Sequence, residues 1–160
     1  MSKIIVYCHP HKINLNKRES HWQVPIFKQI LKDRNIEESD TIIDSIDVRP
    51  GGTITTDAFS DQFIKLSQHK YNIVILPDCA GPWFEFQKKD TPENLQSLLL
   101  LMVKLTKLVK PGGTIMFGKI LYEGWFEILT THLIEFGFDA QINTYPIYET
   151  LSIRYITLEL

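Results

Sequence analysis

Residues that can do chemistry gather where several predicted strands stop. They are Cys8, His9, Asp47, Asp57 and Asp78, and the small residue Ala58 directly follows Asp57. Parallel strands of an open sheet end at a common edge, and ligands of such sheets bind in the crevice beyond that edge. A carboxylate there can accept hydrogen bonds from hydroxyl groups or take up a proton during a reaction. The pattern therefore predicts a ligand-binding edge with acids at several strand ends.

The elements that would position these residues follow from the hydrophobic pattern. Apolar or alternating runs predict strands at 3–7, 41–48, 53–56, 72–76, 114–118, 140–145 and 152–158. Helical spacing predicts helices at 25–34, 60–68, 92–109 and 124–136, and residues 77–90 are expected to form a loop. Strands that alternate with helices pair in parallel through right-handed crossovers. We therefore expect an α/β protein, a three-layer Rossmann-like sandwich whose mostly parallel sheet carries a C-terminal antiparallel hairpin.

Composition limits the class of protein. The chain has 160 residues, a net charge of -2, 44% hydrophobic and 22% charged residues, which is typical of one globular domain covering residues 1–160. These values exclude a disordered, collagen-like or disulfide-scaffold chain and disfavour a globally basic nucleic-acid binder. No signal peptide or membrane span is expected, and the two cysteines suit a reducing compartment. A cytoplasmic protein is the expectation.

Four segments carry a family resemblance. They are SIDVRP, TTDAF, NIVILPDCAGPW and LVKPGGTIMFG. Together with the closing helix and hairpin, they resemble the middle and C-terminal parts of class I S-adenosylmethionine-dependent methyltransferases over roughly the last three quarters of the chain. The resemblance implies a methyltransferase-like fold with S-adenosylmethionine as cofactor. The turn Lys110 to Gly113 is its most specific element.

The resemblance also implies roles for individual residues. Asp47 would hold the ribose hydroxyls, Asp57 and Ala58 would face the adenine, and Cys8 and His9 stand where the family has its glycine-rich loop. Asp78 opens the expected catalytic loop and is assigned both to the cofactor and to catalysis. Methyl transfer mainly requires that the two reactants be aligned and water excluded.

Two side chains are the candidates for catalysis, and each has a structural alternative. Asp78 could accept a proton from the nucleophile, or it could cap the following loop. Trp83 could stack on a planar acceptor, or it could cover the core. Ala80 and Gly81 stand where amino-methyltransferases of nucleobases carry an acid and a proline, which disfavours a nucleobase amine as the acceptor.

One departure from the family supports a second function. The chain has no glycine from Met1 to Pro50, so the backbone after the first strand is expected to avoid positive φ. This favours the alternative of a catalytically inactive, methyltransferase-like binding or scaffolding protein. A short basic segment makes nucleic acid a further candidate partner, or forms a solvated face; its residues are His9, His11, Lys12, Lys17, Arg18 and His21. No metal-ligand spacing is visible, and the C-terminal edge strand offers a pairing surface for a homodimer.

Overall fold

A computed structural model describes residues 2–8, 11–14, 24–76, 81–117, 125–148 and 151–160. Its strands are β1 (Ser2–Tyr7), β2 (Thr41–Asp47), β3 (Ile54–Thr55), β4 (Tyr71–Leu76), β5 (Val109–Phe117), β6 (Asp139–Tyr148) and β7 (Leu151–Glu159). Its α-helices are α1 (Val24–Asp33), α2 (Asp61–Leu66), α3 (Gly81–Lys88), α4 (Pro92–Thr106) and α5 (Trp125–Phe136), and Glu38–Asp40 forms a 3₁₀ turn before β2.

The strands form one mixed sheet of seven, in the order β3-β2-β1-β4-β5-β7-β6. The first five are parallel, whereas β7 pairs antiparallel with both β5 and β6. The expected α/β sandwich with a C-terminal antiparallel hairpin is confirmed. The chain first builds outward from β1 to β3 and then returns to β4 on the other side of β1, so strand order reverses between β1 and β4. Crevices that bind ligands form at such reversals.

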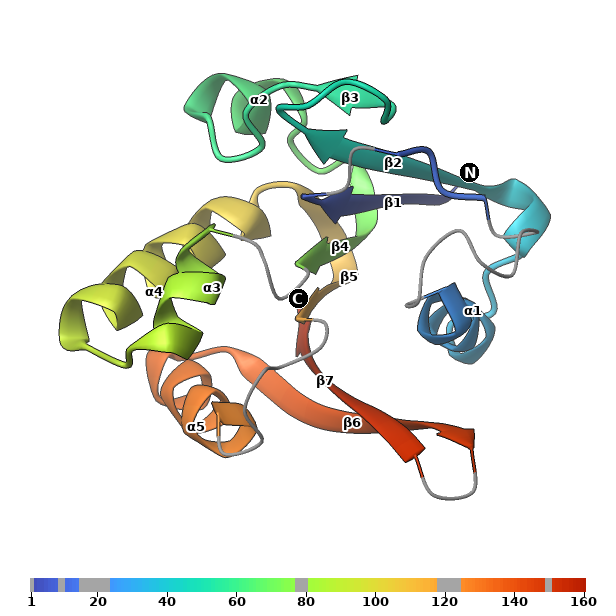
Figure 1. The fold of residues 1–160 in the computed structure, drawn as a ribbon. Coiled ribbons are helices and arrows are strands. Elements are labelled where there is room, and N and C mark those ends of the chain that lie inside the picture. Colours follow the sequence, from blue (N-terminus) through green and yellow to red (C-terminus); the bar gives the residue numbers. More distant parts are fainter. Residues whose placement is uncertain (1, 9–10, 15–23, 77–80, 118–124, 149–150) are drawn as a thin grey trace.

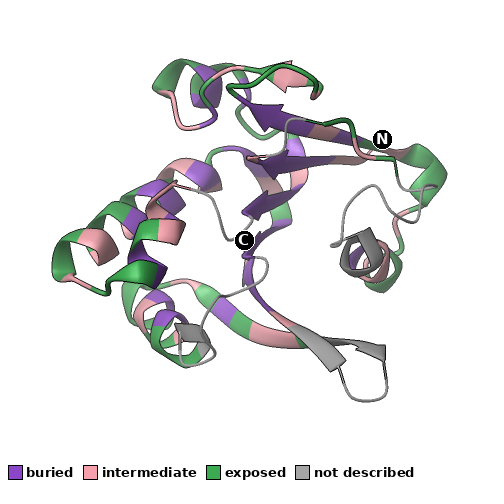
Figure 2. Cartoon of the chain, viewed as in Figure 1, coloured by how far each residue is buried: buried purple, intermediate pink, exposed green. Residues whose placement is uncertain are grey.

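The two faces of the sheet are covered unequally. Side chains of α2, α3, α4 and α5 pack on one face together with Ile5, Val74 and Ile115. The other face carries Val6, Ile75 and Met116, and Ile30 and Leu31 of α1 pack there. Figure 1 shows α1 on one side of the sheet and α3, α4 and α5 on the opposite side. Buried residues concentrate along the central strands (Figure 2), because strands covered on both faces are apolar throughout.

Local chemistry explains where α4 begins. Thr91 precedes the helix, and its hydroxyl accepts a 3.1 Å hydrogen bond from the backbone N–H of Asn94. Pro92 occupies the first helical position, where its missing N–H has no partner to lose. The sequence prediction of this start is confirmed. The predicted end at 109 is wrong, since the helix stops at Thr106 and Val109 already belongs to β5.

The Lys-Pro-Gly-Gly segment lies inside β5 rather than before it. Gly112 has φ +79, a left-handed conformation that most other residues avoid. At Gly113 a Cβ atom would lie 2.7 Å from the Asn72 carbonyl oxygen of the neighbouring strand. The register between β4 and β5 shifts at this place. The two glycines therefore let β5 bend and still pair with β4.

Helix α3 was not expected, because residues 77–90 were predicted to form a loop. Its first turn holds Gly81 and Pro82, two residues that lower helix propensity in an interior. Pro82 nevertheless suits a first turn, and Trp83 and Phe86, three residues apart, are buried on one side of the helix. Tertiary packing thus outweighs the local signal. Within the described ranges, no helix combines the length and apolar composition needed to cross a bilayer.

Candidate functional site

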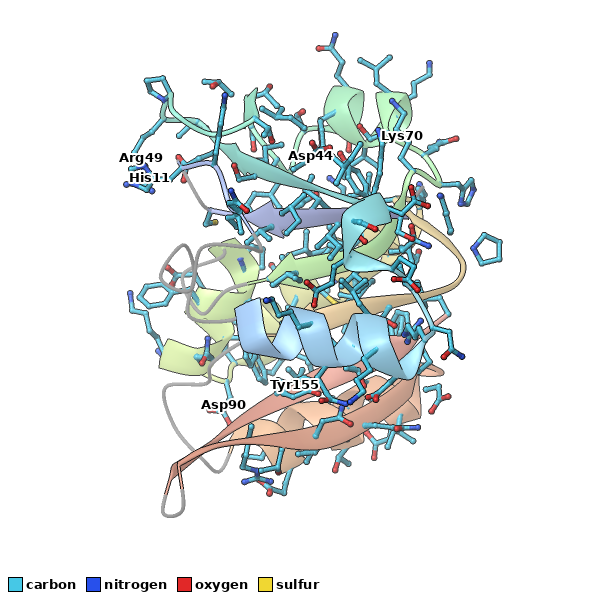
Figure 3. All side chains as sticks on the ribbon, turned by 90° about the vertical axis from the view of Figure 1, so that its right-hand side faces the viewer. His11, Asp44, Arg49, Lys70, Asp90 and Tyr155 are labelled. Atoms are coloured by element: carbon cyan, nitrogen blue, oxygen red, sulfur yellow. The ribbon has the colours of Figure 1, made fainter. Side chains whose placement is uncertain are left out.

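The carboxyl ends of β1, β2 and β3 lie next to one another. Tyr7, the last residue of β1, is in register with Ile46, and Asp47 is in register with Thr55 of β3. This pairing brings Cys8, Asp47 and the residues after β3 to one edge of the sheet. Figure 3 draws Arg49 and His11 at this edge and Lys70, which precedes β4, near the opposite edge. The predicted gathering of Cys8, Asp47 and Asp57 at one edge agrees with the backbone pairing.

Asp47 is the most strongly constrained acid at this edge. Its side chain is only 7% exposed. Its Oδ1 accepts hydrogen bonds from the backbone N–H of Arg49 at 2.9 Å and from Arg49 Nε at 3.0 Å, and its Oδ2 accepts one from Arg49 Nη2 at 2.9 Å. The hydrogen bond from the Arg49 side chain stabilises the charged form and lowers the pKa of Asp47 to about 2. Asp47 is therefore an ionised, acceptor-only group at neutral pH.

Cys8 directly follows β1 and has φ +54. The prediction that the backbone here avoids positive φ is wrong at this residue. A left-handed conformation is uncommon for a residue with a Cβ atom and strains the backbone by roughly 1–2 kcal/mol. The chain therefore makes, without glycine, a turn of the kind that a glycine usually makes at the end of a first strand. His9, which follows, lies outside the described residues.

The residues after β3 differ in exposure. Asp57 is exposed, and its Oδ1 accepts a 3.0 Å hydrogen bond from the backbone N–H of Phe59. Ala58 is buried at 7% exposure. The small side chain of Ala58 is part of the core, whereas Asp57 is exposed to solvent. The backbone turn thus sets an exposed acceptor beside a small apolar position.

Phe59 is a site residue that the sequence reasoning missed. Its ring lies edge-on to Tyr7, with ring centroids 5.4 Å apart and an interplanar angle of 64°. A Cβ atom built on Gly81 would lie 3.3 Å from Phe59 Cε2. Phe59 therefore contacts the end of β1 and the first residue of α3 at once. An aromatic residue directly after the Asp57-Ala58 pair was the available signal.

Trp83 has no exposed surface. Its ring stacks against Phe86 and meets Phe117 of β5 edge-on, with centroids 6.4 and 5.3 Å away, respectively. Among the described residues, its Nε1 has no hydrogen-bond partner. These contacts favour the interpretation of Trp83 as a core residue, and its catalytic assignment stays a prediction. Asp78 lies outside the described residues, so its two assignments also stay predictions.

The structure also describes other polar groups near the edge. Among the described residues, no cluster of three or more His, Cys, Asp or Glu side chains is arranged to hold a metal ion. Tyr7 is fully buried, and its hydroxyl has no hydrogen-bond partner within the described part of the chain. Burial is the main cause that raises its pKa far above the ordinary value. Among the described residues at this edge, Asp47 is thus a buried carboxylate that stays ionised at neutral pH.

Comparison with known proteins identifies the fold. No family model and no curated protein matches the sequence. Among solved structures, a SAM-dependent methyltransferase from Archaeoglobus fulgidus superimposes with a TM-score of 0.52 at 12% identity, over 99% of this chain and 86% of that one. A SAM-dependent methyltransferase from Aquifex aeolicus gives 0.51 at 9% identity, over 99% and 81%. The antibiotic-resistance methyltransferase Kmr gives 0.50 at 12% identity, over 99% and 86%. The chain therefore has the class I methyltransferase-like fold.

Proposed function

We propose that this protein binds S-adenosylmethionine at the carboxyl edge of β1, β2 and β3 and is a small methyltransferase. The observation that carries the proposal is Asp47, a buried and ionised carboxylate at the end of β2 in a methyltransferase-like sheet. A carboxylate at the end of the second strand of a Rossmann-like sheet can accept hydrogen bonds from ribose hydroxyls. The fold likeness to SAM-dependent methyltransferases supports this choice of cofactor.

The described residues fit the adenosine part of this cofactor. Asp47 supplies only acceptors, as ribose hydroxyls require. Asp57 and Ala58 would border the adenine with one exposed acceptor and one small apolar side chain. The left-handed turn at Cys8 changes the direction of the backbone where the family approaches the cofactor. These features agree with the roles that the resemblance implies.

Methyl transfer needs little covalent chemistry from the protein. The cofactor, when bound, supplies an electrophilic methyl group. The chain would hold the ribose through Asp47, align the acceptor and keep water out of the crevice. Asp78 remains the proposed group that accepts a proton from the acceptor. Trp83 remains the proposed stacking residue, although its ring would first have to become accessible, since it has no exposed surface.

A second candidate function is a methyltransferase-like binding or scaffolding protein without catalysis. The absence of glycine from Met1 to Pro50 supports it, as does the occupation of both Asp47 oxygens by Arg49. Under this alternative, Asp47→Ala and Asp57→Ala would leave partner binding unchanged. A cytoplasmic location and a single domain over residues 1–160 belong to either proposal. A homodimer that pairs through the edge strand β6 and a nucleic-acid partner are further proposals, and they rest on the sequence.

Calorimetric titration distinguishes the two functions. The wild-type chain is titrated with S-adenosylmethionine and with S-adenosylhomocysteine, alongside Asp47→Ala and a control, Asp139→Asn. Asp139 is an exposed acid that pairs in register with Glu159 and lies at the opposite edge of the sheet. We expect binding by the wild type and the control and at least a tenfold loss in Asp47→Ala, because the carboxylate would make charge-assisted hydrogen bonds to the ribose. No heat at millimolar ligand would remove the methyltransferase proposal.

A further inference from the structure

The partner of Asp47 is the next charged residue along the chain. Arg49 donates to Asp47 three times, once from its backbone N–H and twice from its side chain. The two side-chain hydrogen bonds reach different oxygens, so the guanidinium and the carboxylate meet in the forked arrangement typical of arginine–carboxylate pairs. Both oxygens that would accept from a ribose diol are therefore already engaged.

Exposure shows which member of the pair can move. The Asp47 side chain is 7% exposed, whereas the Arg49 side chain is 66% exposed. The Asp47 carboxylate is buried at the end of β2, and the Arg49 guanidinium lies between it and the solvent. Because the Arg49 side chain is mostly in water already, water can hydrogen-bond its guanidinium once the two side-chain hydrogen bonds to Asp47 are broken. Asp47 is therefore the buried acceptor of the pair, and the exposed Arg49 side chain is the member that a ligand would displace.

We infer that Arg49 is a specificity-determining residue that competes with the ribose diol for Asp47. This inference rests on the proposed function, since it concerns the carboxylate assigned to the ribose. In the described conformation Arg49 occupies the acceptor, and a nucleoside must displace it before both hydroxyls can bind. The interaction of Arg49 with Asp47 lowers the affinity of any ligand whose diol binds Asp47. A ligand without the diol does not need Asp47 and is not subject to this competition.

The expected change in ligand affinity follows from the strength of the ion pair between Arg49 and Asp47. Exposed ion pairs change an equilibrium only modestly, and forked pairs lie at the upper end of that range, so removal of Arg49 should tighten binding by about 3- to 10-fold. Lysine keeps the charge but cannot form the fork. Arg49→Lys should therefore give an intermediate affinity, which a purely electrostatic effect of the charge would not.

The test is calorimetric titration of the wild type, Arg49→Ala, Arg49→Gln and Arg49→Lys with S-adenosylhomocysteine, and with adenosine against 2′-deoxyadenosine. Lys70→Ala is the control, because Lys70 is an exposed cation that precedes β4 near the opposite edge of the sheet and has no part in the pair. We expect tighter binding of the two diol ligands in Arg49→Ala and Arg49→Gln, an unchanged affinity in Lys70→Ala, and a much smaller gain for the deoxynucleoside.

The outcomes separate this inference from the function on which it rests. Wild-type binding with equal or weaker binding in both Arg49→Ala and Arg49→Gln would overturn the competition and leave the proposed cofactor in place. An equal gain for adenosine and 2′-deoxyadenosine would also overturn it, because the hydroxyls would then not matter. No binding by any variant would overturn both. Circular dichroism and thermal unfolding of each variant show that the comparison is made between folded proteins.

Discussion

The hydroxyl of Tyr71 donates a 2.8 Å hydrogen bond to Asp44 Oδ2. Tyr71 begins β4 and Asp44 lies in β2, so this bond passes over β1, which separates the two strands in the sheet. Tyr7 of β1 is buried in the same core face as Tyr71, but its own hydroxyl has no partner among the described residues. One core cluster thus holds two buried tyrosines with opposite hydrogen-bonding states.

This contrast predicts opposite effects of one chemical change. Tyr71→Phe removes a hydrogen bond to a charged acceptor and should lower the free energy of unfolding by about 1.5–3 kcal/mol. Tyr7→Phe removes a buried hydroxyl that has no partner within the described ranges, and it should leave that free energy unchanged or raise it by about 1 kcal/mol. Urea unfolding of both variants at pH 7 measures the difference. A loss of stability in Tyr7→Phe as large as that in Tyr71→Phe would contradict the assignment of Tyr7 as unpartnered.

The decrease in the free energy of unfolding at acid pH should depend on Asp47. Its pKa falls from an ordinary 3.8 to about 2 in the folded chain, mainly through the side-chain hydrogen bond from Arg49. A group with a lowered pKa stabilises the fold above its unfolded pKa, and that contribution is lost as pH falls through its folded pKa. Asp47→Asn should therefore be less stable than the wild type at pH 7, with the gap closing between about pH 4 and pH 2. Urea titrations from pH 7 to pH 2 test this, and parallel curves for the two proteins would contradict it.

The two glycines of β5 should respond differently to alanine. At Gly113 the added Cβ would meet Val109 Cγ1 at 2.3 Å and two backbone oxygens at 2.7 and 2.9 Å. At Gly112 it would meet nothing within 4 Å, and only the positive φ opposes it. We expect Gly113→Ala to destabilise by about 3 kcal/mol or more and Gly112→Ala by about 1–2 kcal/mol. Thermal unfolding gives the order, and the reverse order would show that β5 does not pass this close to β4.

The contact between Phe59 and Gly81 can be isolated by a double-mutant cycle. Gly81→Ala adds a Cβ 3.3 Å from Phe59 Cε2 at a residue with φ +23. In the wild-type background this should lower the free energy of unfolding by about 1–2 kcal/mol. In a Phe59→Ala background the steric part disappears, so the loss should shrink by about 0.5 kcal/mol or more. An identical loss in both backgrounds would exclude the ring as the neighbour of residue 81.

Strands were the part of the fold that the sequence predicted best. The apolar runs at the start of the chain and at Asn72 to Leu76 became β1 and β4, because strands buried on both faces are apolar throughout. Helix α3 could not be predicted, since Gly81 and Pro82 indicate a turn locally and only the burial of Trp83 and Phe86 against the sheet makes a helix favourable.

The site shows the same division between local and tertiary causes. The position of Asp47 followed from its place at the end of a strand. Its engagement by Arg49 did not, although the two residues are only two positions apart in SIDVRP. The fork depends on how both side chains are oriented, and spacing along the chain does not determine that orientation. The role of Phe59 depended on Tyr7 and Gly81, which are distant in sequence and meet only when β1 and α3 are in place.

The left-handed turn at Cys8 has a consequence for how such turns can be recognised in a sequence. Glycine usually adopts a left-handed conformation of this kind, yet here a residue with a Cβ atom adopts it. The left-handed conformation therefore does not require glycine at this position. A search for glycine after the first strand would therefore miss this turn, whereas the backbone dihedral angle of Cys8 shows it.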